Sequence, residues 1–321
     1  MLKDRHVTIA DVARAANVSR TLVSFVLNGR KDVAPTTRAR IQQAIEELGY
    51  RPNAVARNLA MKRAGAIGIA CDMETYQDPL YMQFLAAILT TASEMGRRVM
   101  LIPADDQQIQ EVAQDRAVDG ILFLDERVAD PRIAHLLERG IPAAGLWGDD
   151  LDAALQRGFE ELALHLESRS IQHVVCLCGP HDKLFVTKFK QILMDTLQEH
   201  GITATAYYCP PDTEAEVART IAHELKRDGI TAIVASSDRL AINAIHGLHS
   251  ARLRVPDDCA VVGFGDVPTA QWVQPALTTI RVPVRAMALW ATAKVFKQEE
   301  TDQQLIQHTA ASCRLIVRRS C

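Results

Sequence analysis

The sequence of 321 residues contains no apolar run that approaches the ~18 residues of a membrane-spanning helix. Its first residues, MLKDRHVTIADVA, also lack the apolar stretch of a signal peptide, so we expect a cytoplasmic protein with no membrane partner. The seven cysteines are scattered and odd in number, which argues against a disulfide framework and predicts reduced thiols. Since 48% of the residues are hydrophobic and 23% are charged, the composition is that of a soluble globular protein, and the length predicts two or three domains.

The motifs of common enzyme and metal sites are also missing. There is no Gly-rich phosphate loop, no nucleophile elbow and no metal triad, and Ser237 and Asp238 have no matched histidine nearby. Cys176, Cys178 and His181 have a C-x-C-x2-H spacing, but a fourth ligand is not evident and VVCLC is typical of a buried strand. We therefore expect no enzyme activity, no cofactor and no metal.

Positive charge is concentrated at the start of the chain. Residues 1–63 contain 12 lysines and arginines against 5 acidic residues, whereas the remainder contains 24 against 34. A basic head on an acidic body predicts a polyanionic partner for the head.

Three short helices are predicted in residues 1–50. Thr8 begins a capping box, Ser19 is a good N-cap for a second helix, and Pro35 begins a third that ends at Gly49. The first two helices are joined by a tight turn and form a helix-turn-helix candidate. Periodicity on the second helix, VSRTLVSFVLNG, places Phe25 on its exposed side.

Residues 51–63, RPNAVARNLAMKR, form a short and weakly apolar segment. A helix this short is unstable by itself in water, so the segment is either a linker or a helix that folds on binding.

The remaining chain, residues 64–321, alternates apolar runs with helical stretches. The runs AIGIA, RVMLIPA, VDGILFLD and IPAAGLW form one series, and QHVVCLCGP, ATAYYCP, AIVASSD and CAVVGFGD form a second. This pattern predicts two doubly wound α/β lobes with parallel sheets, whose ligand site lies at the carboxyl ends of the strands. We assign about 64–156 and 284–312 to the first lobe and about 157–283 to the second.

The sequence resembles the lactose-repressor (LacI/GalR) family of bacterial transcription regulators. The motifs that carry the resemblance are VTIADVARAANVSRTLVSFVLNG, TRARIQQAIEELGYRPNAVARNLA, IGIACD, VDGILFLD, SSDRLAINAIHGL, LRVPDDCAVVGFGDVP and PALTTIRVP. The resemblance implies a small all-α DNA-binding head, a hinge helix at 51–63, and a bilobal core like that of periplasmic sugar-binding proteins. It also implies a homodimer on a near-palindromic operator, and we expect no tetramer because no leucine-heptad tail follows CRLIVRRSC.

The resemblance implies that the second helix lies in the DNA major groove and that the hinge meets the minor groove. Arg20 and Thr21 match base-choosing positions, and Leu59 matches the leucine that wedges into the minor groove. The implied DNA-binding residues are Thr8, Ser19, Arg20, Thr21, Ser24, Phe25, Asn28, Tyr50, Asn53, Arg57 and Leu59.

Phe25 departs from the family, which has arginine at this position. Arginine reads guanine through two hydrogen bonds, whereas phenylalanine offers only apolar contact, most plausibly with a thymine methyl group. The alternative is that Phe25 folds sideways onto the small core of the head.

The resemblance also implies an effector site in the cleft between the lobes, formed by Leu80, Tyr81, Trp147, Phe189, Ser237 and Gly265. At four of these positions the resemblance implies a ligand-binding arginine, asparagine or aspartate, and Trp147, Phe189, Ser237 and Gly265 stand there instead. A sugar needs many directional hydrogen bonds, so we expect that a simple sugar is not the effector. Asp238 and Asp266 are expected to have capping and structural roles.

Three interpretations of function remain open. The leading one is a repressor whose operator affinity is set by an apolar or aromatic effector. In the second, the cleft is filled and the regulator needs no effector. A pure small-molecule-binding protein is the third, which the basic head and the missing signal peptide oppose.

Overall fold

The computed structural model describes residues 7–27, 33–50, 63–72, 78–148, 152–209, 231–296 and 312–321. The chain divides into two compact units, Met1–Ala64 and Gly65–Cys321. Each unit has a hydrophobic cluster of its own. None of the helices within the described ranges is long and apolar enough to cross a membrane.

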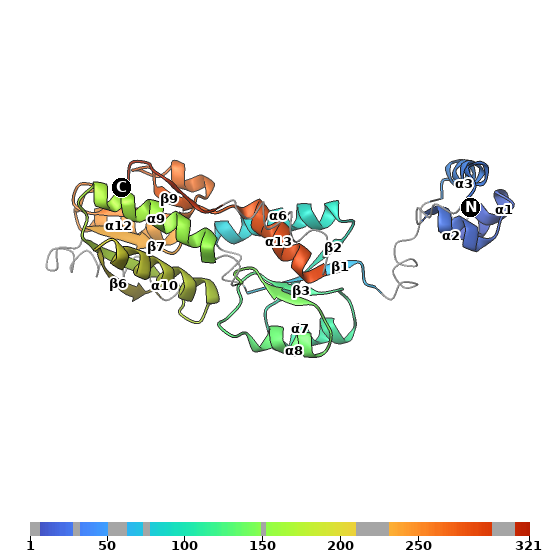
Figure 1. Ribbon diagram of the computed structural model, residues 1–321, viewed down its shortest axis with the longest axis horizontal. Helices are drawn as coiled ribbons and strands as arrows, with labels where there is room; N and C mark the ends of the chain where they lie inside the picture. The colour runs from blue at the N-terminus through green and yellow to red at the C-terminus, as the bar shows by residue number, and fades with distance from the viewer. Residues whose placement is uncertain are drawn as a thin grey trace. The chain divides into compact units, whose positions relative to one another are not determined.

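The first unit is a three-helix head (Figure 1). Its helices are α1 (Ile9–Ala15), α2 (Arg20–Leu27) and α3 (Pro35–Leu48). The core of the head contains Val12, Val23 and Ile41, all without solvent exposure.

Local capping sets the boundaries of these helices. Thr8 donates its backbone N–H to Asp11 Oδ2 at 3.0 Å in a capping box, and Ser19 Oγ accepts a hydrogen bond from Leu22 N at 3.2 Å. Gly49 ends α3 with φ of +60°, a left-handed conformation that glycine adopts without a steric penalty. The predicted starts of α1 and α2 and the predicted end of α3 are therefore confirmed. Ala34, at the N-cap of α3, makes no side-chain hydrogen bond.

The second unit has two lobes, and the first is built on a four-stranded parallel sheet of order β2-β1-β3-β4. Its strands are β1 (Ala66–Cys71), β2 (Arg98–Pro103), β3 (Ile121–Phe123) and β4 (Ala143–Gly145). Two helices cover each face of this sheet (Figure 1). One face has α6 (Pro79–Glu94) and α13 (Val284–Phe296), and the other has α7 (Asp106–Gln114) and α8 (Pro131–Glu138).

The second lobe is built on a six-stranded sheet of order β10-β9-β8-β7-β5-β6. Its strands are β5 (His173–Cys178), β6 (Thr203–Tyr208), β7 (Ala232–Ala235), β8 (Ala260–Gly265), β9 (Thr278–Arg281) and β10 (Arg314–Ile316). The helices α9 (Asp152–Ser168) and α10 (Leu184–Glu199) pack on one face, and α12 (Asp238–Ser250) packs on the other. A short 3-10 helix, η2 (Pro268–Gln271), follows β8.

The sequence predicted a wholly parallel second sheet. This prediction is wrong at one edge, because β10 runs antiparallel to β9. From β9 the chain passes to α13 in the first lobe, and β10 comes back from there, so the two strands run in opposite directions. β10 therefore closes one edge of the sheet.

One hydrophobic cluster continues through both lobes of the second unit. It contains Ile67 and Phe84 from the first lobe together with Phe159 and Phe264 from the second. The seven cysteines are all buried and form no disulfide.

Candidate functional site

The exposed face of α2 presents polar side chains. Ser19, Arg20 and Thr21 are exposed, and Ser24 is half-buried. Thr8 is also exposed at the start of α1. These side chains are accessible to DNA, as a reading helix requires.

Helical periodicity predicted that Phe25 points away from the core of the head, but the structure shows otherwise. Phe25 is half-buried and packs against the cluster that contains Val12, Val23 and Ile41. A three-helix core of this size leaves apolar surface uncovered at its margin, so a large ring gains burial by turning sideways onto it. The part of the ring that stays accessible is the part that could contact DNA.

The remaining residues that the sequence predicts to bind DNA divide into two groups. Tyr50 is half-buried and packs against the core of the head. The residues Asn28, Asn53, Arg57 and Leu59 lie outside the described residues.

The predicted effector residues of the first lobe lie in an aromatic cluster that also includes side chains of the second lobe. Trp147 follows β4 and is only 1% exposed. Its ring lies 4.2 Å from that of Phe185, at the start of α10, and 6.4 Å from that of Tyr81, on α6. Leu80 is also buried, next to Tyr81. Trp147 therefore contacts an aromatic ring from each side of the cleft.

Phe189 lies deeper than an effector contact would. It has no solvent exposure and packs edge-on against Phe159 at 5.2 Å and Phe264 at 5.5 Å. These two partners come from α9 and β8 of the same lobe. Its described contacts therefore place Phe189 in the core of the second lobe.

Ser237 and Gly265 have local structural roles. Ser237 Oγ caps α12 by accepting a hydrogen bond from Leu240 N at 3.2 Å. Gly265 has φ of +129°, and a side chain built there would meet Asp238 and Leu80. Leu80 of the first lobe thus approaches the backbone of the second lobe at Gly265.

Asp238 stabilises the second lobe from within. Its carboxylate accepts hydrogen bonds from Val267 N at 2.8 Å and Thr279 Oγ1 at 2.5 Å. Burial raises the pKa of Asp238 to about 6, although both hydrogen bonds act in the opposite direction. Asp266 pairs with Arg281 and Arg318, at 2.7 Å and 2.5 Å. Both aspartates therefore make the structural contacts that were expected, whereas the cap of α12 is Ser237 and not Asp238.

Lys183 of the second lobe places its charge against the first lobe. Its Nζ lies 2.7 Å from Asp72 Oδ2 and 2.5 Å from Asp125 Oδ2. These aspartates follow β1 and β3, which are neighbours in the first sheet. Burial alone would lower the pKa of Lys183, but the two carboxylates outweigh burial and raise it. The ammonium is therefore held charged between two carboxylates of the opposite lobe.

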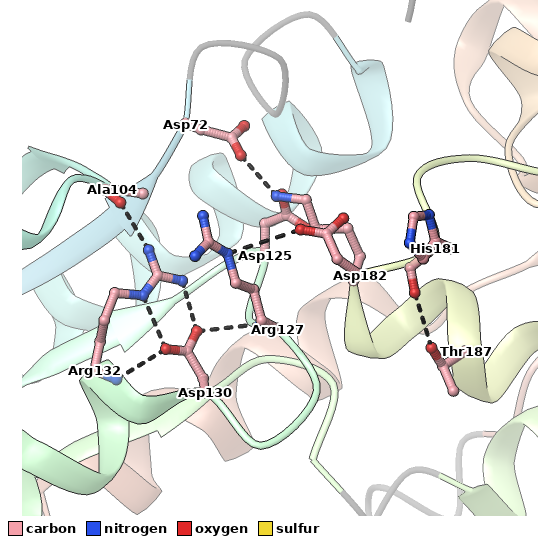
Figure 2. A network of polar contacts seen from close by, with 10 residues as sticks. Asp72, Ala104, Asp125, Arg127, Asp130, Arg132, His181, Asp182 and Thr187 are labelled. Atoms are coloured by element: carbon pink, nitrogen blue, oxygen red, sulfur yellow. Dashed lines mark hydrogen bonds and ion pairs between the residues drawn. The ribbon is translucent and has the colours of Figure 1, made fainter. Parts of the chain in front are cut away.

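The backbone also connects the lobes next to this ion pair. Arg127 and Lys183 form an antiparallel β-bridge, in which Leu184 N donates to Glu126 O at 2.9 Å and Val128 N donates to Asp182 O at 3.2 Å. Arg127 Nε lies 3.8 Å from Asp182 Oδ2. Figure 2 shows this contact between the two side chains. The lobes thus share main-chain hydrogen bonds as well as side-chain contacts.

Glu126 holds the backbone of Trp147 by hydrogen bonds. Its carboxylate accepts hydrogen bonds from Trp147 N at 2.5 Å and Leu146 N at 3.1 Å. Burial raises the pKa of Glu126 to about 7, against the effect of these hydrogen bonds. A side chain at Gly145 would collide with this carboxyl group, so the glycine is needed for close approach.

Sequence reasoning missed the residues that complete the site. Phe84, Phe185 and Phe264 supply rings, and Lys183 and Asp125 supply the charged pair. A signal was available in GPHDKLFVTKF, where Phe185 and Phe189 are four residues apart and so lie on one face of a helix. The contacts between the lobes had no local signal.

The group Cys176, Cys178 and His181 does not gather as a metal site would. The two buried Sγ atoms lie 3.4 Å apart, and the His181 ring packs against Tyr208 instead. Over the ranges that the structure covers, no group of three or more His, Cys, Asp or Glu residues is arranged to hold a metal ion.

The head and the core together define a class of protein: a helix-turn-helix DNA-binding regulator with a bilobal α/β core. Residues 8–53 match the family described as bacterial regulatory proteins, lacI family, and residues 163–321 match the periplasmic binding protein-like domain.

Proteins similar to this chain include several helix-turn-helix regulators. An uncharacterised HTH-type transcriptional regulator in the aml 5' region of Streptomyces limosus is 32% identical, with 94% of this chain and 90% of the relative covered. Catabolite control protein A of Priestia megaterium is 28% identical, with 94% and 96% covered. The solved structure of a lac repressor dimer bound to operator and the anti-inducer ONPF is 24% identical, with a TM-score of 0.74 and 98% and 99% covered.

The chain belongs to the lacI family of bacterial regulatory proteins and is a transcriptional regulator.

Proposed function

We propose that the protein is a repressor that binds a near-palindromic operator as a homodimer, in the cytoplasm where the chromosome lies. The observation that carries this proposal is the basic head, whose second helix exposes Arg20 and Thr21. The lac repressor neighbour is a dimer bound to its operator, which supports the same arrangement here. A selection of operator sequences from genomic fragments tests the proposal, and a failure to enrich any sequence would refute it.

Contacts of α2 with base edges would select the operator sequence. Arg20 can donate two hydrogen bonds to guanine, and Thr21 can contact a neighbouring base. Phe25 cannot donate a hydrogen bond, so its accessible edge would make apolar contact with a thymine methyl group. The operator should therefore differ from those of relatives at the base pair that faces residue 25.

Restoring arginine at this position gives a direct prediction. Phe25→Arg should shift the preferred base toward guanine by about 1–3 kcal/mol, because a bidentate contact becomes available. Repeating the operator selection with the variant measures this shift. Gln42→Arg is the matched control, since it adds the same charge to an exposed position on α3. It should strengthen binding to all DNA alike. The same operator from the Phe25→Arg protein would mean that residue 25 only packs.

We propose that the dimer forms along the first lobe. Large apolar side chains are exposed on α6 and on the edge strand β2, which pack against each other. They are Met82, Leu89, Met100 and Leu101, with exposures between 37% and 48%. Exposed apolar side chains on neighbouring elements are typical of a protein interface.

A charge in this surface should separate the subunits. Leu89→Asp removes the burial of one leucine on each subunit, about 1.5–3 kcal/mol per copy. The dissociation constant of the dimer should then rise at least about a hundredfold, as sedimentation equilibrium can measure. Leu137→Asp is the control, because Leu137 is also an exposed leucine of the first lobe but lies on α8. A stable tetramer in reducing buffer, or equal dissociation by both variants, would contradict the proposal.

We also propose that the core does not bind a simple sugar. The positions that would bind one are occupied by Trp147, Phe189, Ser237 and Gly265, and the first three are buried. Ser237 already uses its hydroxyl as a helix cap. Few directional hydrogen bonds are left for a polyol.

A further inference from the structure

We propose that residues 183–185 of the second lobe act as a built-in ligand of the interlobe cleft, which holds the core closed without a small molecule. The inference rests on the proposed function, since it concerns how the regulator is controlled. It goes beyond that function because it assigns the cleft to the chain's own side chains. Operator binding would then not depend on an effector in this cleft.

The first part of the argument is the position of Lys183. In doubly wound sheets, ligands sit outside the carboxyl ends of the central strands. The Lys183 ammonium occupies this position in the first lobe, between Asp72 after β1 and Asp125 after β3. The side chains of Lys183 and Asp125 are only 14% and 10% exposed. A ligand cation placed there would have to displace the lysine.

The second part is the position of Phe185. Its ring lies 4.2 Å from that of Trp147, with an angle of 34° between the planes. The ring of Phe264, on β8, lies 5.1 Å from the ring of Phe185 and 6.4 Å from that of Trp147. Trp147 also packs edge-on against Phe84 of α6 at 5.5 Å. The phenylalanine ring thus contacts the tryptophan in the manner of a bound aromatic ligand.

The third part is the backbone of the same segment. Leu184 N donates to Glu126 O and Val128 N donates to Asp182 O, around the isolated bridge between Arg127 and Lys183. Main-chain hydrogen bonds of this kind are also how proteins hold a bound peptide. A cation, a ring and main-chain groups are therefore presented by consecutive residues, as a bound peptide would present them.

Burial of Trp147 provides a readout that needs no DNA. The chain has three tryptophans, and the full-length Trp272→Phe/Trp290→Phe protein retains only Trp147. Because Trp147 is 1% exposed, acrylamide should quench its fluorescence weakly in plain buffer. Native mass spectrometry of the same sample should give the mass of the chains alone. Strong quenching in buffer, or a small molecule bound to the protected protein, would overturn the proposal.

Variants of the segment test the cause of this protection. In the same background, Lys183→Met and Phe185→Ala should each increase quenching of Trp147 several-fold, and the double variant should increase it further. Lys183→Met keeps the apolar stem and the Phe185 ring, so it tests the charge even if Phe185→Ala folds poorly. Benzene should restore protection to Phe185→Ala, because an apolar cavity of this kind accepts it.

The matched controls remove the same groups from contacts inside the second lobe. Lys188 lies on the same helix and pairs with Asp152 at 2.6 Å, and Phe159 packs on Phe189 and Phe264. Lys188→Met and Phe159→Ala should leave Trp147 protected. Equal exposure in these controls would mean that the protection reflects general stability, and the proposal would fall. A protein that behaves as expected here but selects no operator would refute the proposed function alone.

Discussion

A fragment that begins at Arg63 should remain folded and bind the operator at least about a thousandfold more weakly than the full chain. The reason is that the excess of lysine and arginine lies in residues 1–63, whereas the remaining chain is acidic. Phosphate contacts release counterions, so the affinity of the full chain should also fall steeply as salt rises. Fluorescence anisotropy with a labelled operator at several salt concentrations measures both effects.

The fragment provides its own folding control. The second unit, Gly65–Cys321, has a separate hydrophobic core, so its unfolding temperature should match that of the same unit in the full chain. Operator binding by the folded fragment would show that the core contains a DNA-binding surface, and the role assigned to the head would be wrong.

Arg132→Met should destabilise the core by about 3 kcal/mol, because it leaves a buried carboxylate without its partner. Arg132 Nη2 lies 2.6 Å from Asp130 Oδ2, and the two side chains are 7% and 1% exposed. The guanidinium also donates to the carbonyl oxygen of Ala104 at 2.7 Å, as Figure 2 shows. Asp130 accepts a further hydrogen bond from Arg127 N, at the β-bridge between the lobes. The pair therefore supports the first-lobe loop that forms the β-bridge with the second lobe.

The pH dependence of this effect has a defined sign. Burial alone would raise the pKa of Asp130, but Arg132 and the backbone hydrogen bonds outweigh it and hold the pKa below 3.8. The native pair therefore contributes stability above that value, which is lost as the pH falls through the pKa of the folded state. The deficit of Arg132→Met should be largest near neutral pH and should shrink as the pH falls, because an unpaired and buried Asp130 takes up a proton more readily than the paired one.

Urea unfolding at each pH gives the free energies for this comparison. Arg254→Met is the control, because Arg254 also pairs with an aspartate, Asp258, but its side chain is 71% exposed. It should change the stability little, since exposed ion pairs contribute little. An effect of Arg132→Met as small as that of the control would mean that Asp130 finds another donor.

Local signals in the sequence were sufficient for the helix boundaries. The capping box at Thr8 and the left-handed Gly49 involve only hydrogen bonds and dihedral angles within a few residues. The alternation of apolar runs likewise predicts the strands that form the two sheets, because runs such as those of β1 and β5 are buried along almost their whole length. These features depend on short stretches of chain, which a sequence displays directly.

The packing of the site depends on distant residues and could not be predicted in this way. Helical periodicity exposes Phe25, but the margin of a small core provides burial for its ring. Trp147 and Phe185 are far apart in the chain, and nothing near either residue indicates that their rings meet. The pairing of Lys183 with Asp72 likewise spans 111 positions of the sequence. The sequence therefore indicates an apolar cleft but not which side chains fill it.

The hydrophobic cluster that runs through both lobes makes them a single cooperative unit. Separating the lobes would transfer Trp147 and Phe185 into water, although they are now almost fully buried. Partial separation of the two lobes therefore exposes apolar side chains to water and is unfavourable. Intermediates in which only one lobe is folded are disfavoured for the same reason. Amide protons of β1 in the first lobe and β5 in the second should consequently exchange through the same global event, as if the bilobal core were one domain.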